Sequence, residues 1–242
     1  MTVTCPSVAT TELVKGVRAT RSTIALKLAM ATSGIIFIIY VLLHMYGNLR
    51  AFAGHDAYDT YAEHLRTIGV PMLPHSGALW VVRVVLIASV ITHVWSAAAL
   101  WRRANRARSA RYQVKRNVAS SLSSRTMRWG GVAILLFVIW HLIEFTIGKV
   151  NITGGATNDP YNLLVDSFSG SSWWMVVIYL LALLALAFHL HHGTFSACQT
   201  LGFTNTASSR ARARIFGWVL AIVICGGFAL VPIFIVAGVI TK

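Results

Sequence analysis

The chain has 242 residues, of which 56% are hydrophobic and only 12% charged, and its mean hydropathy is +0.67. Soluble domains carry about twice this share of charge, near 25%, so the composition excludes a soluble enzyme and a disordered segment. The formal net charge of +14 is of the kind seen in nucleic-acid-binding proteins. The positions of the charges argue instead for a membrane protein that binds no nucleic acid.

The first 27 residues form a polar arm that is followed by a membrane domain over residues 28–242. The arm contains Glu12 and lacks the apolar core and cleavage site of a signal peptide, so we expect the first helix to remain as an anchor. The two longest loops on the opposite side, 49–78 and 149–172, contain proline and glycine breakers and have the length of small amphipathic segments. We expect no separate soluble domain.

Five apolar runs follow the arm, each close to the roughly 20 residues that a helix needs to cross a bilayer. Only Arg83 and Glu144 are formally charged within them. Because non-helical spans would leave backbone groups unpaired in lipid, the sequence predicts an all-α fold, an integral membrane five-helix bundle. The predicted helices cover residues 28–48, 79–101, 129–148, 173–192 and 215–240.

The basic residues gather on one side of this predicted topology. Sixteen of the 21 lysines and arginines lie in the arm and in the segments 102–128 and 201–214, whereas six of the seven acids lie on the other side or in the third helix. An excess of Lys and Arg marks the cytoplasmic side, so we expect a cytoplasmic N-terminus and an external C-terminus. The same basic face would suit anionic lipid headgroups or an acidic partner.

Histidines occur in each of the first four predicted helices. Ionisable residues inside a membrane are costly and are therefore functional candidates. A rise of about 1.5 Å per residue puts His44 and His141 roughly 6 and 10 Å from the outer ends of their helices. His93 and His189 lie in the inner half by the same arithmetic. The sequence therefore predicts two histidine pairs at two depths.

Two imidazoles from facing helices are the ligands of a six-coordinate b-type haem, which favours electron transfer over oxygen chemistry. The second nitrogen of each ring needs a hydrogen-bond partner. Helical spacing offers Tyr40 for His44, and Ser89 and Ser96 for His93. Glycines that would let a flat macrocycle approach the helices are Gly34, Gly130 and Gly131.

Two further candidates follow from position alone. In the fourth helix His192 shares a face with His189, whereas His191 points about 200° away from it, and at most one of the three is an axial ligand. We consider His192 a candidate for a haem propionate. Arg83 lies about one helical turn inside the membrane and either snorkels outward or pairs with a propionate of the outer haem.

The run Phe188-His-Leu-His-His-Gly-Thr-Phe-Ser-Ala-Cys-Gln-Thr-Leu-Gly202 resembles the fourth-helix signature of a known family. The family is that of the five-helix, dihaem cytochrome b subunits of succinate dehydrogenase, in the succinate:menaquinone reductase and fumarate reductase class. The likeness covers nearly the whole chain. In the family the ligand lies four residues before the signature's glycine, which selects His189 over its two neighbours. The family's pairing of helices implies an outer haem on His44 and His141 and an inner haem on His93 and His189.

The resemblance implies a membrane anchor of a bacterial plasma membrane that belongs to the tricarboxylic acid cycle and the respiratory chain. A flavoprotein subunit would oxidise succinate, and an iron–sulfur subunit would deliver electrons through two b haems to menaquinone. Both soluble subunits would dock on the cytoplasmic face. The chain itself, with three scattered cysteines, would contribute only the quinone-reducing site of the complex.

Quinone reduction consumes protons, and Glu144 is the carboxyl group best placed to supply them. It lies three residues after His141 on the same helical face. Its two interpretations are a proton relay beside an outer quinone site and a carboxylate satisfied by a neighbouring helix.

Two other functions fit part of the pattern. One is the cytochrome b subunit of another quinone-linked dehydrogenase, such as a formate dehydrogenase or a hydrogenase, which lacks the fourth-helix signature. The other is a proton or metal transporter that uses intramembrane histidines, although such proteins tend to show internal repeats and interrupted helices.

Overall fold

The computed structural model describes residues 22–107, 122–147, 150–151, 155–156 and 158–242. In this part of the chain five helices are long and apolar enough to cross a membrane, which confirms the predicted all-α, five-helix fold. Most of the predicted arm and several of its basic residues lie outside the described residues, as do the basic residues between 108 and 121 and Lys149.

The five long helices are joined by short elements. The long helices are α1 (Thr23–Leu49), α3 (Gly77–Arg106), α4 (Leu122–Leu142), α6 (Trp174–Thr200) and α7 (Ala207–Val236). A π-helical turn, Ile143–Ile147, continues α4. Two short helices, α2 (His55–Thr67) and α5 (Pro160–Phe168), lie in the predicted loops, with 3-10 turns at Arg50–Ala53 and Gly170–Ser172. The strands β1 (Val150–Asn151) and β2 (Gly155–Ala156) form one antiparallel pair.

The helix ends differ from the predicted ones because hydropathy detects only the part of a helix that lies in hydrocarbon. The fifth helix was predicted at 215–240, and both bounds are wrong. Its start lies at Ala207, where Thr206 and Ser209 form a capping box that satisfies the first free N–H groups. Its end lies at Val236 because Gly238 takes a positive φ of 73°, which turns the chain out of the helix.

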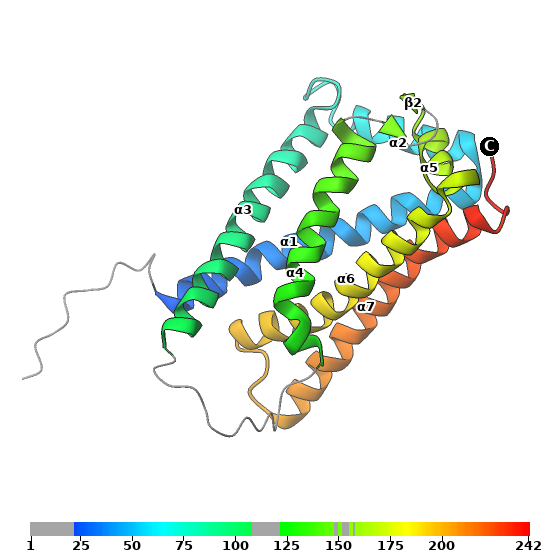
Figure 1. Ribbon diagram of the computed structural model, residues 1–242. Coiled ribbons are helices and arrows are strands. Elements are labelled where there is room, and N and C mark those ends of the chain that lie inside the picture. Colours follow the sequence, from blue (N-terminus) through cyan, green and yellow to red (C-terminus); the bar gives the residue numbers. More distant parts are fainter. Residues whose placement is uncertain (1–21, 108–121, 148–149, 152–154, 157) are drawn as a thin grey trace, which may run out of the picture.

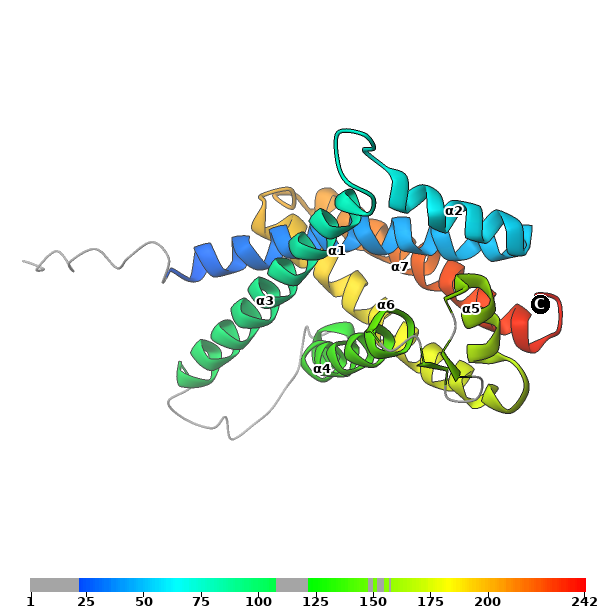
Figure 2. The ribbon, with the colours of Figure 1, turned by 90° about the horizontal axis from the view of Figure 1, so that it is seen from above.

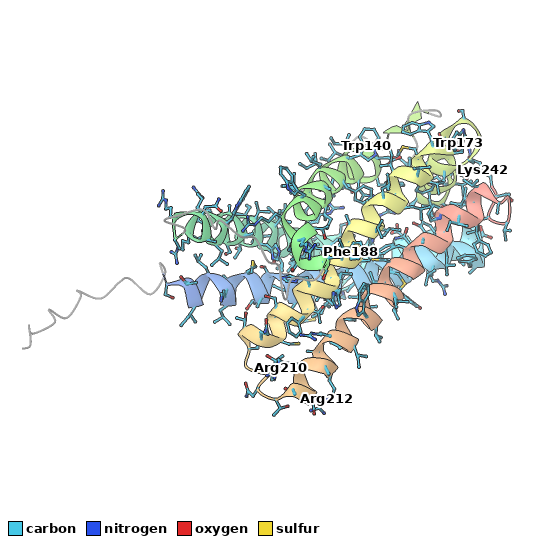
Figure 3. The ribbon with its side chains drawn as sticks, turned by 60° about the horizontal axis from the view of Figure 1, so that its bottom comes forward. Trp140, Trp173, Phe188, Arg210, Arg212 and Lys242 are labelled. Carbon is cyan, nitrogen blue, oxygen red and sulfur yellow. The ribbon has the colours of Figure 1, made fainter. Side chains whose placement is uncertain are left out.

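The bundle has two distinct ends, which Figure 1 shows at lower left and upper right. We call the first the basic end. There α1, α4 and α7 begin and α3 and α6 end, among arginines that include Arg102, Arg103, Arg106, Arg210 and Arg212. We call the second the capped end, formed by α2, α5 and residues 237–242. Figure 3 shows Arg210 and Arg212 at one end, and Trp173 and Lys242 at the other.

Helix packing is uneven along the bundle. The helices α6 and α7 lie side by side (Figures 1 and 2), while α1 contacts α3, α6 and α7, and α4 contacts α6. Many aliphatic and aromatic side chains of the long helices face outward, as Trp129 and Ile24 do at 78% exposure each. Such a surface is expected where lipid rather than water surrounds the helices.

The largest buried cluster lies at the capped end. Six of the nine residues of α5 are buried, among them Tyr161, Leu164 and Phe168, and they pack against α6 and α7. Asp159 caps the first turn of α5 by accepting the Asn162 N–H at 2.8 Å. A segment that the sequence indicates as part of an external loop is thus a buried helix that covers this end of the bundle.

Candidate functional site

Four long helices each contribute one histidine to the interior. His44 on α1 faces His141 on α4, with 5.9 Å between the ring centroids. His93 on α3 faces His189 on α6, with 6.1 Å between the centroids. The structure therefore brings together the same two pairs that sequence depth and resemblance combine. His141 lies near the capped end of α4 and His189 in the half of α6 that leads to the basic end.

The residues of each pair fit a haem. A metal that binds two imidazole nitrogens at about 2 Å each separates the ring centroids by about 6 Å, as in both pairs. Nδ1 of His189 is buried and has no hydrogen-bond partner in the described part of the chain. A Cβ on Gly34 would lie 3.6 Å from the His93 ring, and one on Gly131 would lie 3.6 Å from the His189 ring. Both are ordinary van der Waals distances, so each glycine leaves space beside its ring that a larger side chain would fill.

A pocket of about 200 Å³ lies next to His189 of the His93–His189 pair. It is lined by side chains of α4 and α6, which are mostly apolar, and Gly130 contributes to its wall. An apolar slot with one imidazole in it suits the hydrocarbon edge of a macrocycle.

Aromatic rings surround the pair at the capped end. Tyr40 stacks on His44 at 5.5 Å with an interplanar angle of 9°, and Phe228 of α7 lies 5.6 Å from the same ring. Phe137 and Phe145 flank His141 at 5.9 and 5.1 Å. This environment excludes water, which strengthens every polar contact within it.

Glu144 lies in the π-helical turn after α4 and is only 3% exposed. Its Oε2 accepts the hydroxyl of Tyr179 at 2.7 Å, and the Tyr179 oxygen lies 3.3 Å from Nδ1 of His141. A carboxyl group, a phenol and an imidazole thus form one chain between α4 and α6. Sequence reasoning missed Tyr179. The signal was present, because Tyr179 carries the only hydroxyl between Trp173 and Phe188.

The partner of His93 also differs from the expected ones. Nδ1 of His93 lies 3.1 Å from Oγ of Ser33 on the neighbouring α1, whereas Ser89 and Ser96 were the candidates on its own helix. Both are buried, and Oγ of Ser96 has no partner in the described part of the chain. Helical spacing identified side chains near the histidine but not the helix that faces its ring.

The other two histidines of α6, His191 and His192, have surroundings that differ from those of His189. His191 stacks on Trp218 of α7 at 4.3 Å, and its Nδ1 lies 3.1 Å from Oγ of Ser123 on α4. It does not face His93. His192 is half-buried next to it.

Arg83 is exposed on α3, where its guanidinium lies 5.0 Å from the centroid of the Trp80 ring. Arg83 lies in the second turn of α3, which begins at Gly77 at the capped end, and so it is on the side of the His44–His141 pair.

A second polar cluster joins α2 to α5 at the capped end. His55, Asp59 and Asp159 bring one ligand atom each to within 4.8 Å of one another. The hydrogen bond with Asp159, at 2.8 Å, and that with Asp56 raise the pKa of His55. Burial pushes the pKa of Asp159 upward, but the Asn162 N–H and His55 together hold it below its usual value.

A comparison with protein families finds one match. The model of the family described as "Succinate dehydrogenase/Fumarate reductase transmembrane subunit" matches residues 102–229, which is more than half of the chain. The matched region contains His141, Glu144, Tyr179 and His189, and lacks His44 and His93. No curated protein and no solved structure matches the chain.

Proposed function

This chain belongs to the family of succinate dehydrogenase and fumarate reductase transmembrane subunits, and from that membership we propose that it is a dihaem cytochrome b anchor. The two pairs of histidines from four helices, at centroid distances of 5.9 and 6.1 Å, carry the proposal. His44 and His141 would hold an outer haem b, and His93 and His189 an inner one.

The electron balance of the proposed complex is simple. Oxidation of one succinate in a flavoprotein subunit releases two electrons and two protons. An iron–sulfur subunit would deliver these electrons at the end of the bundle where His93 and His189 would hold the inner haem. Reduction of one menaquinone to menaquinol takes up two electrons and two protons, so the balance closes. The basic end, with six arginines on α3 and α7, suits the docking of these subunits on the cytoplasmic face of a bacterial membrane.

Three side chains complete the proposed site. Glu144 would relay protons to the quinone, supported by its burial and its hydrogen-bonded chain. Arg83 would pair with a propionate of the outer haem, supported by its position in the second turn of α3 at the capped end. His192 would contact a propionate of the inner haem from the same helix as His189.

The test is the visible spectrum of the purified complex, oxidised and reduced. Two low-spin haems per chain are expected, and a colourless protein would end the proposal. His189→Ala should remove one haem, whereas His191→Ala, two positions away but stacked on Trp218, should keep both. Equal loss in the two variants would contradict the assignment of His189.

A further inference from the structure

Tyr179 of α6 lies between the His141 ring and the Glu144 carboxyl. Its hydroxyl donates to Oε2 of Glu144 at 2.7 Å, and its oxygen lies 3.3 Å from Nδ1 of His141. A phenol carries one hydrogen. Because that hydrogen is given to Glu144, the oxygen is left as an acceptor toward His141. Nδ1 of His141 therefore carries the ring hydrogen, and Nε2 keeps its lone pair.

The residues around Glu144 and Tyr179 fix the direction of these hydrogen bonds. Glu144 also has hydrogen bonds with Trp140 and Ser167. The indole N–H of Trp140 can only donate, so the carboxyl group acts as an acceptor toward Trp140 as well as toward Tyr179. Phe137 and Phe168 pack edge-on against the Tyr179 ring, each at 4.8 Å. Tyr179 is 9% exposed and Glu144 is 3% exposed. The phenol and the carboxyl group are therefore packed and shielded from solvent.

The other histidine pair has no comparable chain in the described residues. Nδ1 of His93 meets Oγ of Ser33, a hydroxyl whose own hydrogen goes to the Ala29 carbonyl at 2.8 Å. Nδ1 of His189 is buried without a hydrogen-bond partner. The two pairs therefore have the same donor set but differ in what acts on the second nitrogen of each ring.

We propose that Tyr179, held by Glu144, is a positioning residue that fixes the Nδ1–H tautomer of His141 and lowers the reduction potential of the outer haem. The inference rests on the proposed function, since it takes His141 as an axial ligand. A hydrogen bond from Nδ1–H to a polarised oxygen raises the electron density of the ring and makes Nε2 a stronger donor. A stronger axial donor favours oxidised over reduced iron.

The experiment is a redox titration of the purified complex that follows both haems. In Tyr179→Phe the ratio of reduced to oxidised outer haem at a given ambient potential should rise about tenfold. This is the lower end of the effect of removing a hydrogen-bond partner of a metal ligand. For a one-electron couple this is a rise of about 59 mV. Glu144→Gln keeps the phenol but weakens its acceptor, so it should shift the same midpoint upward by less.

Two further variants make the result specific. Ser33→Ala removes one hydrogen-bond partner of His93, which keeps its bond with the Met30 carbonyl, and should move only the inner midpoint. Tyr161→Phe deletes another buried hydroxyl of the capped end, which donates to the Thr241 carbonyl at 2.8 Å, and should move neither midpoint.

The outcomes separate the inference from the function it rests on. Two haems with an unshifted outer midpoint in Tyr179→Phe would overturn the inference and leave the proposed function intact, as would equal shifts of both midpoints. A wild-type complex without haem would overturn both. If Tyr179→Phe loses the outer haem, the inference is tested by Glu144→Gln. An upward shift of the outer midpoint in that variant supports the inference, and an unchanged midpoint overturns it.

Discussion

The capped end and the basic end of this bundle offer the same pair of imidazoles in different surroundings. At the capped end the His44–His141 pair lies near a buried carboxyl group and a phenol, under the buried helix α5. Toward the basic end the His93–His189 pair has a serine hydroxyl, an unpartnered ring nitrogen and a pocket beside it. In the proposed complex, identical imidazoles therefore need not give the two haems identical electron affinities, because different groups contact the second ring nitrogens.

The comparison also separates the chemistry expected at each end. The basic end has exposed cations and lacks a buried carboxyl group among the described residues, which suits docking and electron entry. The capped end holds the only buried acid of the described residues, which suits proton handling. Single substitutions can alter one end at a time.

The largest effect is expected from Glu144→Gln. Loss of a proton-transferring group typically costs about 10²-fold or more in rate, so quinone reduction should fall by about that factor while both haem spectra remain. Succinate-driven menaquinol formation in membrane vesicles measures it. Asp166→Asn removes another acid of the capped end, which pairs with Lys242, and should leave turnover unchanged. Wild-type turnover in Glu144→Gln would remove the proton-relay role.

The basic end is tested by Gly34→Val. A side chain there would press on the His93 ring, which a Cβ alone already approaches to 3.6 Å. Overpacking costs about 1–3 kcal/mol, so inner-haem occupancy should fall by about fivefold or more and the outer haem should stay. Haem content and the low-spin signals of the purified complex report it. Gly226→Ala, where a Cβ meets open space, is the control, and a full inner haem in Gly34→Val would contradict the fit.

Arg83→Leu is expected to shift the midpoint potential of the outer haem by less than Tyr179→Phe does, and in the opposite direction. Removing a positive charge disfavours the added electron, so the midpoint should fall, whereas Tyr179→Phe raises it. The guanidinium is exposed, and a solvated charge near 4 Å contributes about 1 kcal/mol, which limits the change to about fivefold. Arg66→Leu, which breaks an exposed pair with Glu63 on α2, should have no effect. A midpoint unchanged by Arg83→Leu would exclude the propionate contact.

The smallest effect concerns pH at the junction of α2 and α5. The pKa of His55 is raised, so its contribution is present at low pH and is lost as pH rises through a value above about 6.5. The pKa of Asp159 is lowered, so its contribution is lost as pH falls through a value below about 3.9. Protection of the α5 amides from hydrogen exchange should be greatest between these limits. His55→Ala should flatten this dependence, and a retained pH optimum would assign it elsewhere.

Much of this arrangement follows from the sequence. Apolar runs of membrane length predicted the five helices, which the fold confirms, and the depths of His44, His93, His141 and His189 predicted which of them lie close together. Their role as haem ligands stays a prediction. Helix ends were less accessible, because capping at Thr206 and the turn at Gly238 depend on local polar groups that hydropathy does not report.

The hydrogen-bond partners escaped the sequence for a different reason. Tyr179 and Ser33 reach their histidines from neighbouring helices, so the rotation of two helices about their axes decides the contact. Spacing within one helix only offered residues such as Ser89 and Ser96. The burial of α5 was equally hidden, because its apolar residues lie between Pro160 and Gly170 in a segment that looks like a surface loop.

The π-helical turn at Ile143–Ile147 has a consequence for the length of this segment. A π turn is an α-helix that has gained one residue, so deleting a residue here would restore regular winding and rotate the downstream residues by about 100°. If the deletion precedes Glu144, the carboxyl group turns away from Tyr179. When the chain is aligned with distant relatives, we therefore expect a single-residue gap at this turn to coincide with loss of the carboxyl group, so that the two features are inherited as one unit.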